Sequence, residues 1–226
     1  MKLGLLQTGH LPDEMLETTG DYSALFTRLL DGHGFQFHTW NVVDNELPDS
    51  PQEADAWLIT GSKHGVYEDH AWISPLEKLI RQIVAAGLPL VGICFGHQIV
   101  AQALGGKVEK FQGGWAIGRH SYDLDGTQLH LNAWHQDQVV TRPEGARVLA
   151  SNDFCENAML AYGDHILTIQ PHPEFTAQEI QSLLEQRAPG VVPEPLIKGA
   201  TAQLPNPVDN PSVSLKMASV LKGEKI

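Results

Sequence analysis

The stretch Leu88-Pro-Leu-Val-Gly-Ile-Cys-Phe-Gly-His-Gln98 indicates both the fold and the chemistry of this chain. An apolar run typical of a buried strand ends at Cys94, and a stretch of helical character follows it. Glycines at 92 and 96 allow the tight, strained turn that exposes a nucleophile between a strand and a helix. The helix dipole and the free N–H groups of its first turn favour a thiolate and can bind an oxyanion. We therefore predict that Cys94 is a nucleophile, although a lone cysteine is more often a small buried apolar residue.

A base for this cysteine is predicted in the segment Gln170-Pro-His-Pro-Glu174. A nucleophilic thiol needs a base, and the base needs an orienting group. His172 and Glu174 are two residues apart, and the prolines at 171 and 173 should hold them on an extended segment, with both side chains on one side. Taken alone, the segment fits a solvated polar loop as well as it fits a catalytic base with its orienting carboxylate. Together with Cys94 it predicts a catalytic triad.

Three further segments are candidates for the same site. The turn Gly61-Ser62 follows an apolar strand and could offer a backbone N–H to an oxyanion, although an ordinary strand-to-helix turn would look the same. Gln98 lies one turn into the helix that follows Cys94, where it can face a substrate. The cluster Trp134-His135-Gln136-Asp137 combines polar and aromatic side chains at a strand end, and a surface loop is the alternative.

Composition excludes several classes of function. The chain has 226 residues, is 42% hydrophobic and carries a formal net charge of −12, which suits one domain and argues against nucleic acids or anionic membranes as partners. Its two cysteines, Cys94 and Cys155, form no disulfide framework and indicate a reducing compartment. With neither a signal-peptide core nor a membrane-spanning run, we expect a cytoplasmic protein. His130 and His135 lack ligand-type spacing and no phosphate-binding loop is visible, so we predict no metal site and no cofactor.

Alternating strand and helix patterns predict an α/β fold with a doubly wound, mostly parallel sheet and a small β-ribbon insertion. The clearest helix signals are two capping boxes, one from Ser74 to Glu77 and one from Thr176 to Glu179. After Gly106 the pattern is rich in strands and turns. We expect a single domain over residues 1–226, with a core at 1–187, a proline-rich linker at 189–211 and a closing helix at 212–222.

The motifs resemble those of the class I, triad-type glutamine amidotransferases. Four segments within about residues 1–187 are similar to motifs of that family and follow one another along the chain in the family's order. They are the oxyanion motif at 59–62, the nucleophile motif at 92–98, the substrate-loop motif at 134–137 and the His-x-Glu motif at 170–174. Gly9-His-Leu-Pro-Asp13 and the string 134–138 look most like the free-standing, GMP-synthase-like branch, which includes γ-glutamyl peptidases. The resemblance implies a flavodoxin-like sheet.

The resemblance also implies roles for the candidate residues. Cys94 would attack the γ-carbonyl of a glutamyl group, with His172 as base and acid and Glu174 orienting it. The backbone N–H of Phe95 and one from Gly61 or Ser62 would hold the oxyanion. The substrate would be gripped by Gln98, Trp134, His135, Gln136 and Asp137.

Two departures from the family pattern bear on the substrate. Pro171 stands where many relatives have an aromatic residue, and Ser62-Lys63 replaces the usual Gly-Pro; both should touch the pocket. No synthetase domain or pyrophosphatase loop is visible, so any ammonia acceptor would sit on a separate synthetase subunit. Three hypotheses stay open: an amidotransferase glutaminase, a γ-glutamyl peptidase without an acceptor, and a non-catalytic binding module on the same fold.

Overall fold

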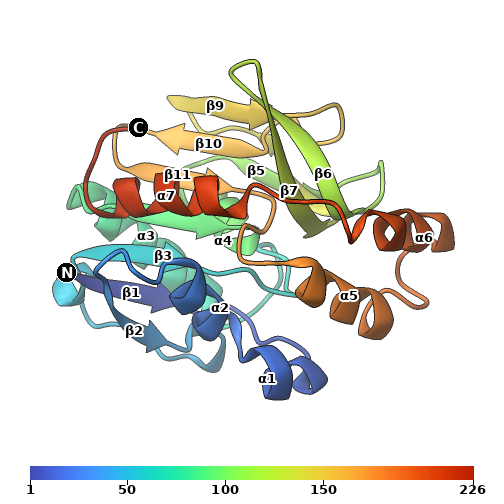
Figure 1. The fold of residues 1–226 in the computed structure, drawn as a ribbon. Coiled ribbons are helices and arrows are strands. Elements are labelled where there is room, and N and C mark those ends of the chain that lie inside the picture. The colour runs from blue at the N-terminus through green and yellow to red at the C-terminus, as the bar shows by residue number, and fades with distance from the viewer.

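A computed structural model describes all residues 1–226, and a nine-stranded sheet forms its centre (Figure 1). The strand order is β2-β1-β3-β4-β11-β10-β9-β6-β7, and β5 pairs with β8 in a separate two-stranded sheet. The strands are β1 (Lys2–Leu6), β2 (Gln36–Trp40), β3 (Ala56–Ile59), β4 (Leu90–Ile93), β5 (Lys107–Lys110), β6 (Ala116–Leu124), β7 (Thr127–His135), β8 (Asp137–Thr141), β9 (Ala146–Ser151), β10 (Met159–Tyr162) and β11 (Ile166–Ile169). The helices are α1 (Asp13–Thr19), α2 (Tyr22–Leu29), α3 (Ile73–Ala85), α4 (Phe95–Ala103), α5 (Ala177–Gln186), α6 (Glu194–Gln203) and α7 (Asn210–Leu221), with 3₁₀ turns at Val42–Asp44 and Pro51–Glu53.

The first five strands of the sheet, β2-β1-β3-β4-β11, are parallel and have the order of a flavodoxin-type fold. Strands β3, β4 and β11 are buried along their whole length, which explains their continuous apolar sequences. The carboxyl ends of parallel strands meet at one edge of a sheet. Consequently the loops after β1, β3, β4 and β11 lie together.

The remaining strands continue the same sheet in antiparallel fashion through β10, β9, β6 and β7. The predicted α/β class with a mostly parallel sheet is therefore confirmed. The β-rich part after Gly106 extends the main sheet through the long β6–β7 hairpin and adds the small β5–β8 ribbon. The end of β7 contacts the β11–α5 segment, where Asn132 and His172 form an isolated bridge.

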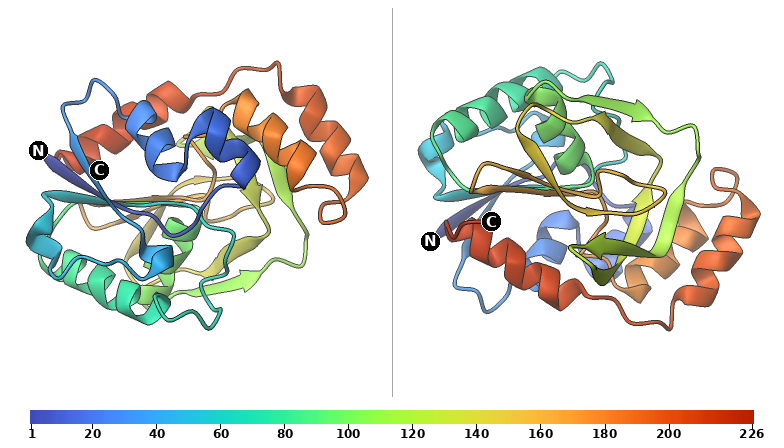
Figure 2. Two further views of the ribbon diagram at one scale, coloured as in Figure 1. Left: turned by 90° about the horizontal axis from the view of Figure 1, so that it is seen from below. Right: turned by 90° about the horizontal axis from the view of Figure 1, so that it is seen from above.

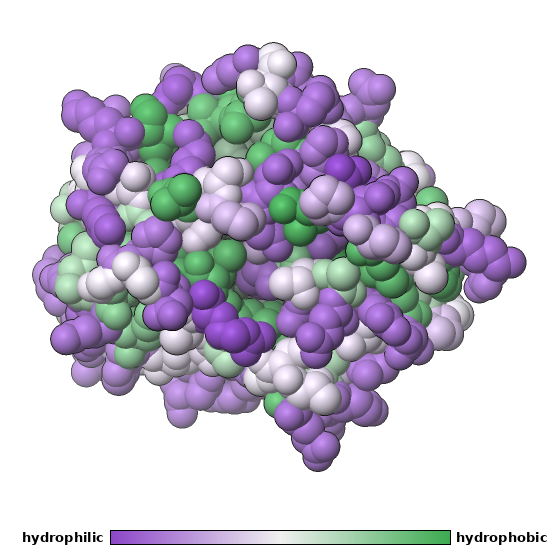
Figure 3. Space-filling model, in the orientation of Figure 1, coloured by the Kyte–Doolittle hydropathy of each residue, from purple (hydrophilic) through white to green (hydrophobic).

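Helices cover both faces of the sheet, as the two views along it show (Figure 2). On one face α1, α2, α5 and α7 pack over a core that includes Phe26, Leu167 and Met217. On the other, α3 and α4 pack over Trp57, Ile80 and Ile99. The face turned to the viewer in Figure 1 is mainly hydrophilic, with apolar side chains scattered in small groups (Figure 3). No helix is long and apolar enough to cross a membrane.

Several local predictions need correction. Helix α3 begins at Ile73 with Trp72 as its N-cap and no side-chain cap, so Ser74 lies inside the helix and Glu77 instead accepts a hydrogen bond from Gln102. The capping box of α5 is present as predicted, with Thr176 and Glu179 in their expected roles. The proline-rich stretch 189–211 is not a plain linker, because α6 forms within it after Pro193.

Candidate active site

Cys94 lies at the sharp turn between β4 and α4, where it is the N-cap of the helix and has φ 51° and ψ −100°. A positive φ is rare for a residue with a side chain and marks local strain. The Cys94 N–H donates to the Ile169 carbonyl at 2.8 Å, which ties the turn to the end of β11. The thiol is thereby placed at the edge of the sheet where the parallel strands end.

The glycines beside Cys94 are required by close packing. A Cβ at Gly92 would lie 2.6 Å from the Gly96 carbonyl oxygen, and a Cβ at Gly96 would lie 2.4 Å from the Ile59 carbonyl oxygen. The Gly96 N–H also donates to Thr60 at 3.1 Å. The strained conformation falls on Cys94 itself, while the two glycines let the strand, the helix and the neighbouring β3 approach one another.

His172 and Glu174 form a buried pair after β11. The His172 Nδ1–H donates to Glu174 Oε1 at 2.7 Å, and both residues are at most 5% exposed. The segment is not extended as predicted, because Phe175 N–H donates back to the His172 carbonyl at 3.3 Å and closes a turn. The turn brings the carboxylate beside the ring and leaves Nε2 as the ring nitrogen available to the thiol.

The imidazole of His172 is fixed from several sides. Its ring stacks on Phe175, with centroids 4.2 Å apart and planes 6° from parallel. Its backbone N–H donates to Asn132 of β7 at 2.7 Å, and the Asn132 side chain donates to the Phe175 carbonyl at 3.0 Å. A Cβ at Gly61 would lie 3.0 Å from the ring, so glycine is needed there for packing. Neither Asn132 nor Phe175 carried a sequence signal for this role.

The electrostatics of the site favour a protonated His172. Burial alone lowers its pKa, but the charges of Glu174 and Cys94, with their hydrogen bonds to the ring, outweigh burial and raise the pKa to about 10. His135, equally buried and without a carboxylate partner, has its pKa lowered to about 3 by burial and by the charge of His172. The thiol and the carboxylate therefore set the ionisation of His172.

Backbone donors are available next to Cys94. The N–H groups of Gly61, Ser62 and Phe95 donate to no backbone carbonyl. Phe95 is the first residue of α4, where N–H groups lack partners within the helix and carry the positive end of its dipole. Gly61 and Ser62 follow β3, the strand next to β4. These are the positions predicted from sequence for an oxyanion hole.

Gln170 is a residue that sequence reasoning quoted in a motif but gave no role. It is fully buried, and its Nε2 lies 3.6 Å from Cys94 Sγ, as a donor to sulfur. Its Oε1 accepts from Gln98 Nε2 at 3.1 Å, and the same Gln98 amide donates to the Asp137 carbonyl at 2.9 Å. Both N–H groups of Gln98 thus hold protein partners, which leaves its carbonyl oxygen for a ligand.

A cavity of about 370 Å³ opens beside Cys94. Of the predicted site residues, it is lined by Cys94, His172, Ser62, Gln98, Trp134, His135, Gln136 and Asp137, while Glu174 lies behind His172. Pro171 does not line it, so the prediction that this residue touches the pocket is wrong. The Ser62-Lys63 pair does touch the cavity, as predicted, because the loop after β3 forms one wall through residues 62–65, Tyr67 and Glu68.

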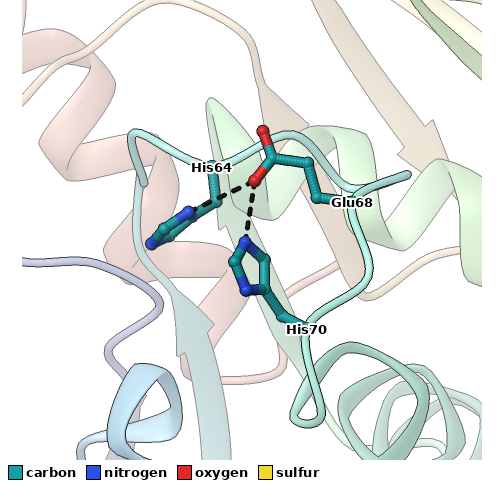
Figure 4. A group of neighbouring side chains, drawn as sticks. All are labelled: His64, Glu68 and His70. Atoms are coloured by element: carbon teal, nitrogen blue, oxygen red, sulfur yellow. Dashed lines mark hydrogen bonds and ion pairs between the residues drawn. The ribbon is translucent and has the colours of Figure 1, made fainter.

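The structure adds lining residues that the sequence did not indicate. They come from loops and helices remote in sequence, and include Tyr22, Lys110, Trp115, Arg187 and Val191. Tyr67 bridges the cavity mouth, because its hydroxyl donates to Asp137 Oδ2 at 2.8 Å. A second cluster that was missed, His64, Glu68 and His70, lies in the same loop (Figure 4). Its spacing, His-x₃-Glu-x-His, is the sequence signal from which it could have been found.

Comparison with known proteins identifies the family of this chain. The family model described as glutamine amidotransferase class-I matches residues 21–188, most of the chain. The chain belongs to the class-I glutamine amidotransferases. This family of enzymes includes relatives of two kinds, and the chain resembles both.

Gamma-glutamyl peptidase 4 of Arabidopsis thaliana is 31% identical over 75% of this chain and 74% of its own length. A GMP synthase of Azoarcus sp. is 34% identical over 62% of this chain, which corresponds to only 29% of that protein. The fold is similar to that of a glutamine amidotransferase from Methylobacillus flagellatus, with a TM-score of 0.74 and 20% identity over 98% of this chain and 92% of that one. It is also similar to that of a glutamine amidotransferase from Thermotoga maritima, with a TM-score of 0.73 and 20% identity over 98% of this chain and 97% of that one.

Proposed function

We propose that this amidotransferase-family enzyme hydrolyses γ-glutamyl amides through a glutamyl thioester on Cys94. The observation that carries the proposal is the strained Cys94 at the start of α4 beside the buried His172–Glu174 pair. A thiol, an imidazole and an orienting carboxylate in this order are the parts that acyl transfer by a cysteine needs.

In the proposed reaction, the Cys94 thiol gives its proton to His172, and Sγ forms a bond to the γ-carbonyl carbon of the substrate while the carbonyl π bond breaks. The oxyanion that develops accepts hydrogen bonds from the N–H of Phe95 and from Gly61 or Ser62. The C–N bond then breaks, and the amine leaves with the proton that His172 donates. A water molecule next adds to the thioester, and His172 takes its proton. The C–S bond then breaks to release glutamate, and His172 returns the proton to sulfur to restore the thiol.

Gln170 supports the charge on sulfur in this scheme. Its Nε2 donor lies 3.6 Å from Sγ, and the protonated His172 ring supplies a positive charge on another side. A thiolate stabilised by a cation and a donor is the reactive form of cysteine. Such a thiol is kept reduced in a reducing compartment, so we retain a cytoplasmic location as part of the proposal.

The substrate class is proposed to extend beyond glutamine to γ-glutamyl compounds with a larger leaving group. The cavity volume, about 370 Å³, falls in the range of about 300–1,000 Å³ that is typical of pockets for larger small molecules. Lys63, Lys110 and Arg187 line it in a chain whose net charge is −12, so the pocket can pair with carboxylates of the substrate. The similarity to γ-glutamyl peptidases over three quarters of the chain supports the same reading.

Transfer of ammonia to a separate synthetase subunit is the second candidate, favoured by the 34% identity with GMP synthase. A panel of γ-glutamyl substrates separates the two. Purified protein should release amine from some γ-glutamyl amide or peptide at least as fast as from glutamine, without ATP. A matched α-glutamyl peptide and the Cys94→Ala variant serve as controls. Turnover that requires an added synthetase would favour the second candidate instead.

A further inference from the structure

The loop between β3 and α3 carries a group of side chains that the proposed reaction does not use. His64, Glu68 and His70 each direct one ligand atom toward the others, and these atoms all lie within 4.8 Å of one another. Figure 4 shows both imidazole rings turned toward the Glu68 carboxylate. The His64 Nδ1 lies 3.3 Å from Glu68 Oε2, and the His70 Nε2 lies 2.7 Å from the same oxygen.

The three residues are held in place by contacts outside the cluster. The His70 ring stacks on the buried Trp72, with centroids 5.6 Å apart and planes 8° from parallel. The His64 N–H donates to Ser62 Oγ at 3.1 Å, and the Glu68 N–H donates to the Gly65 carbonyl at 3.1 Å. A site whose ligands are already oriented loses less conformational entropy when an ion binds.

We propose that His64, Glu68 and His70 bind a divalent transition-metal ion, with Zn²⁺ the best match. Two imidazole nitrogens and one carboxylate oxygen are a known zinc ligand set, and they leave a fourth position open. A tetrahedral ion with bonds of about 2.0–2.1 Å separates its ligand atoms by about 3.3 Å. The His64–Glu68 distance of 3.3 Å already has this value, and the His70–Glu68 distance of 2.7 Å would have to lengthen by about 0.6 Å.

The position of this site gives it a consequence for the cavity. His64 and Glu68 both line the cavity that contains Cys94, and His64 is joined to Ser62 of the oxyanion turn. A bound ion would cross-link the loop to itself and add positive charge at the cavity mouth. Its open position would accept a donor atom from solvent or from a ligand. Metal binding at this loop is independent of whether the cysteine chemistry proceeds as proposed.

The test uses calorimetric titration of the full chain with Zn²⁺ and, separately, absorption spectroscopy with Co²⁺. All variants are made in a Cys94→Ser background, because a thiol beside an imidazole can bind zinc itself. We expect one ion per chain, with Co²⁺ bands that indicate nitrogen and oxygen ligands. Glu68→Gln and His70→Asn should each weaken binding by at least about tenfold, since each removes one of three protein ligands.

His33→Asn is the matched control, because His33 lies in the turn after α2, does not line this cavity and lines another surface hollow. It should leave the affinity unchanged. No stoichiometric binding to the Cys94→Ser protein would overturn the proposal. Binding that persists in both Glu68→Gln and His70→Asn would overturn it as well, since the ion would then be held elsewhere.

Discussion

Two walls of one cavity differ in how their polar side chains are held. The inner wall is defined here by Cys94 and His172, with Gln170 and Glu174 behind them; all four residues are at most 6% exposed and lie at the ends of buried strands. The rim loop, residues 63–72 between the oxyanion turn and α3, keeps Tyr67 at 52% exposure and is held mainly by its own turns and side-chain contacts.

The difference separates the tasks that the two walls can perform. Burial strengthens each charge interaction on the inner wall, so small changes there alter the ionisation of His172. Water screens the rim loop, where charge pairs contribute little energy but side chains can adjust to a ligand. We therefore expect the inner wall to set the rate of turnover and the rim loop to set the affinity for ligands.

The largest effect is expected at Cys94. Cys94→Ser or Cys94→Ala should abolish turnover and leave the fold intact, because a hydroxyl is a poor nucleophile without a rebuilt base. Turnover and circular dichroism of the purified variants check this. A glutamine-mimicking electrophile should modify Cys94 and spare Cys155, which is 2% exposed and whose pKa burial raises to about 12. Modification of Cys155, with activity retained in Cys94→Ala, would contradict the assignment.

The next largest effect separates His172 from Glu174. His172→Ala should lower kcat by about 10²–10⁴-fold, as for the loss of a general acid–base catalyst. Glu174→Gln should cost less, because stacking on Phe175 and the backbone bond to Asn132 still orient the ring. Steady-state kinetics of both variants test the order. A near-wild-type rate for His172→Ala at neutral pH would remove His172 from the mechanism.

Much of the inner wall could be predicted from sequence, for physical reasons. Cys94 lies between a strand and a helix, and glycines at 92 and 96 are the only residues that fit there, so local sequence encodes the turn. His172 and Glu174 are close in sequence, and their pairing needs only a short turn. The α/β class follows from the fully buried strands β3, β4 and β11, whose apolar runs are continuous.

The other parts of the site depend on long-range packing, which no local pattern encodes. Asn132 supports His172 across 40 positions of sequence, and Gln98 meets Gln170 only because α4 packs over β11. Helix α6 was missed because prolines usually mark loops, yet Pro195 lies in the first turn, where the missing N–H has no cost. The Ser74 capping box was overridden by the tertiary contacts of Glu77.

A third prediction uses pH to compare two buried histidines. The pKa of His172 is raised to about 10, which means that the folded protein is stabilised by the protonated His172 ring. This stabilisation is complete below pH 6.5, the ordinary pKa of histidine, and is lost as pH rises toward 10. The pKa of His135 is lowered to about 3, so the protein loses stability as pH falls below 6.5. The free energy of unfolding should therefore decline on both sides of this value.

Denaturant titrations of the wild type and His172→Gln between pH 6.5 and about pH 8 follow the alkaline limb. The decline should be smaller in the variant, because the raised pKa belongs to His172. Cys94→Ser should reduce the decline in part, since Cys94 is one of the groups that raise this pKa. Identical pH dependence in all three proteins would contradict the predicted ionisation.

The smallest effect is expected on the rim loop, at Tyr67. Tyr67→Phe removes the hydrogen bond to Asp137 across the cavity mouth, while the Asp137 backbone stays tied to Gln98. One partly exposed hydrogen bond contributes about 0.5–1.5 kcal/mol, so KM should rise by about tenfold or less with kcat nearly unchanged. Tyr162→Phe is the matched control, since Tyr162 lies outside this cavity. A fall in kcat with constant KM would place the rim loop in the chemical step and remove the division between the two walls.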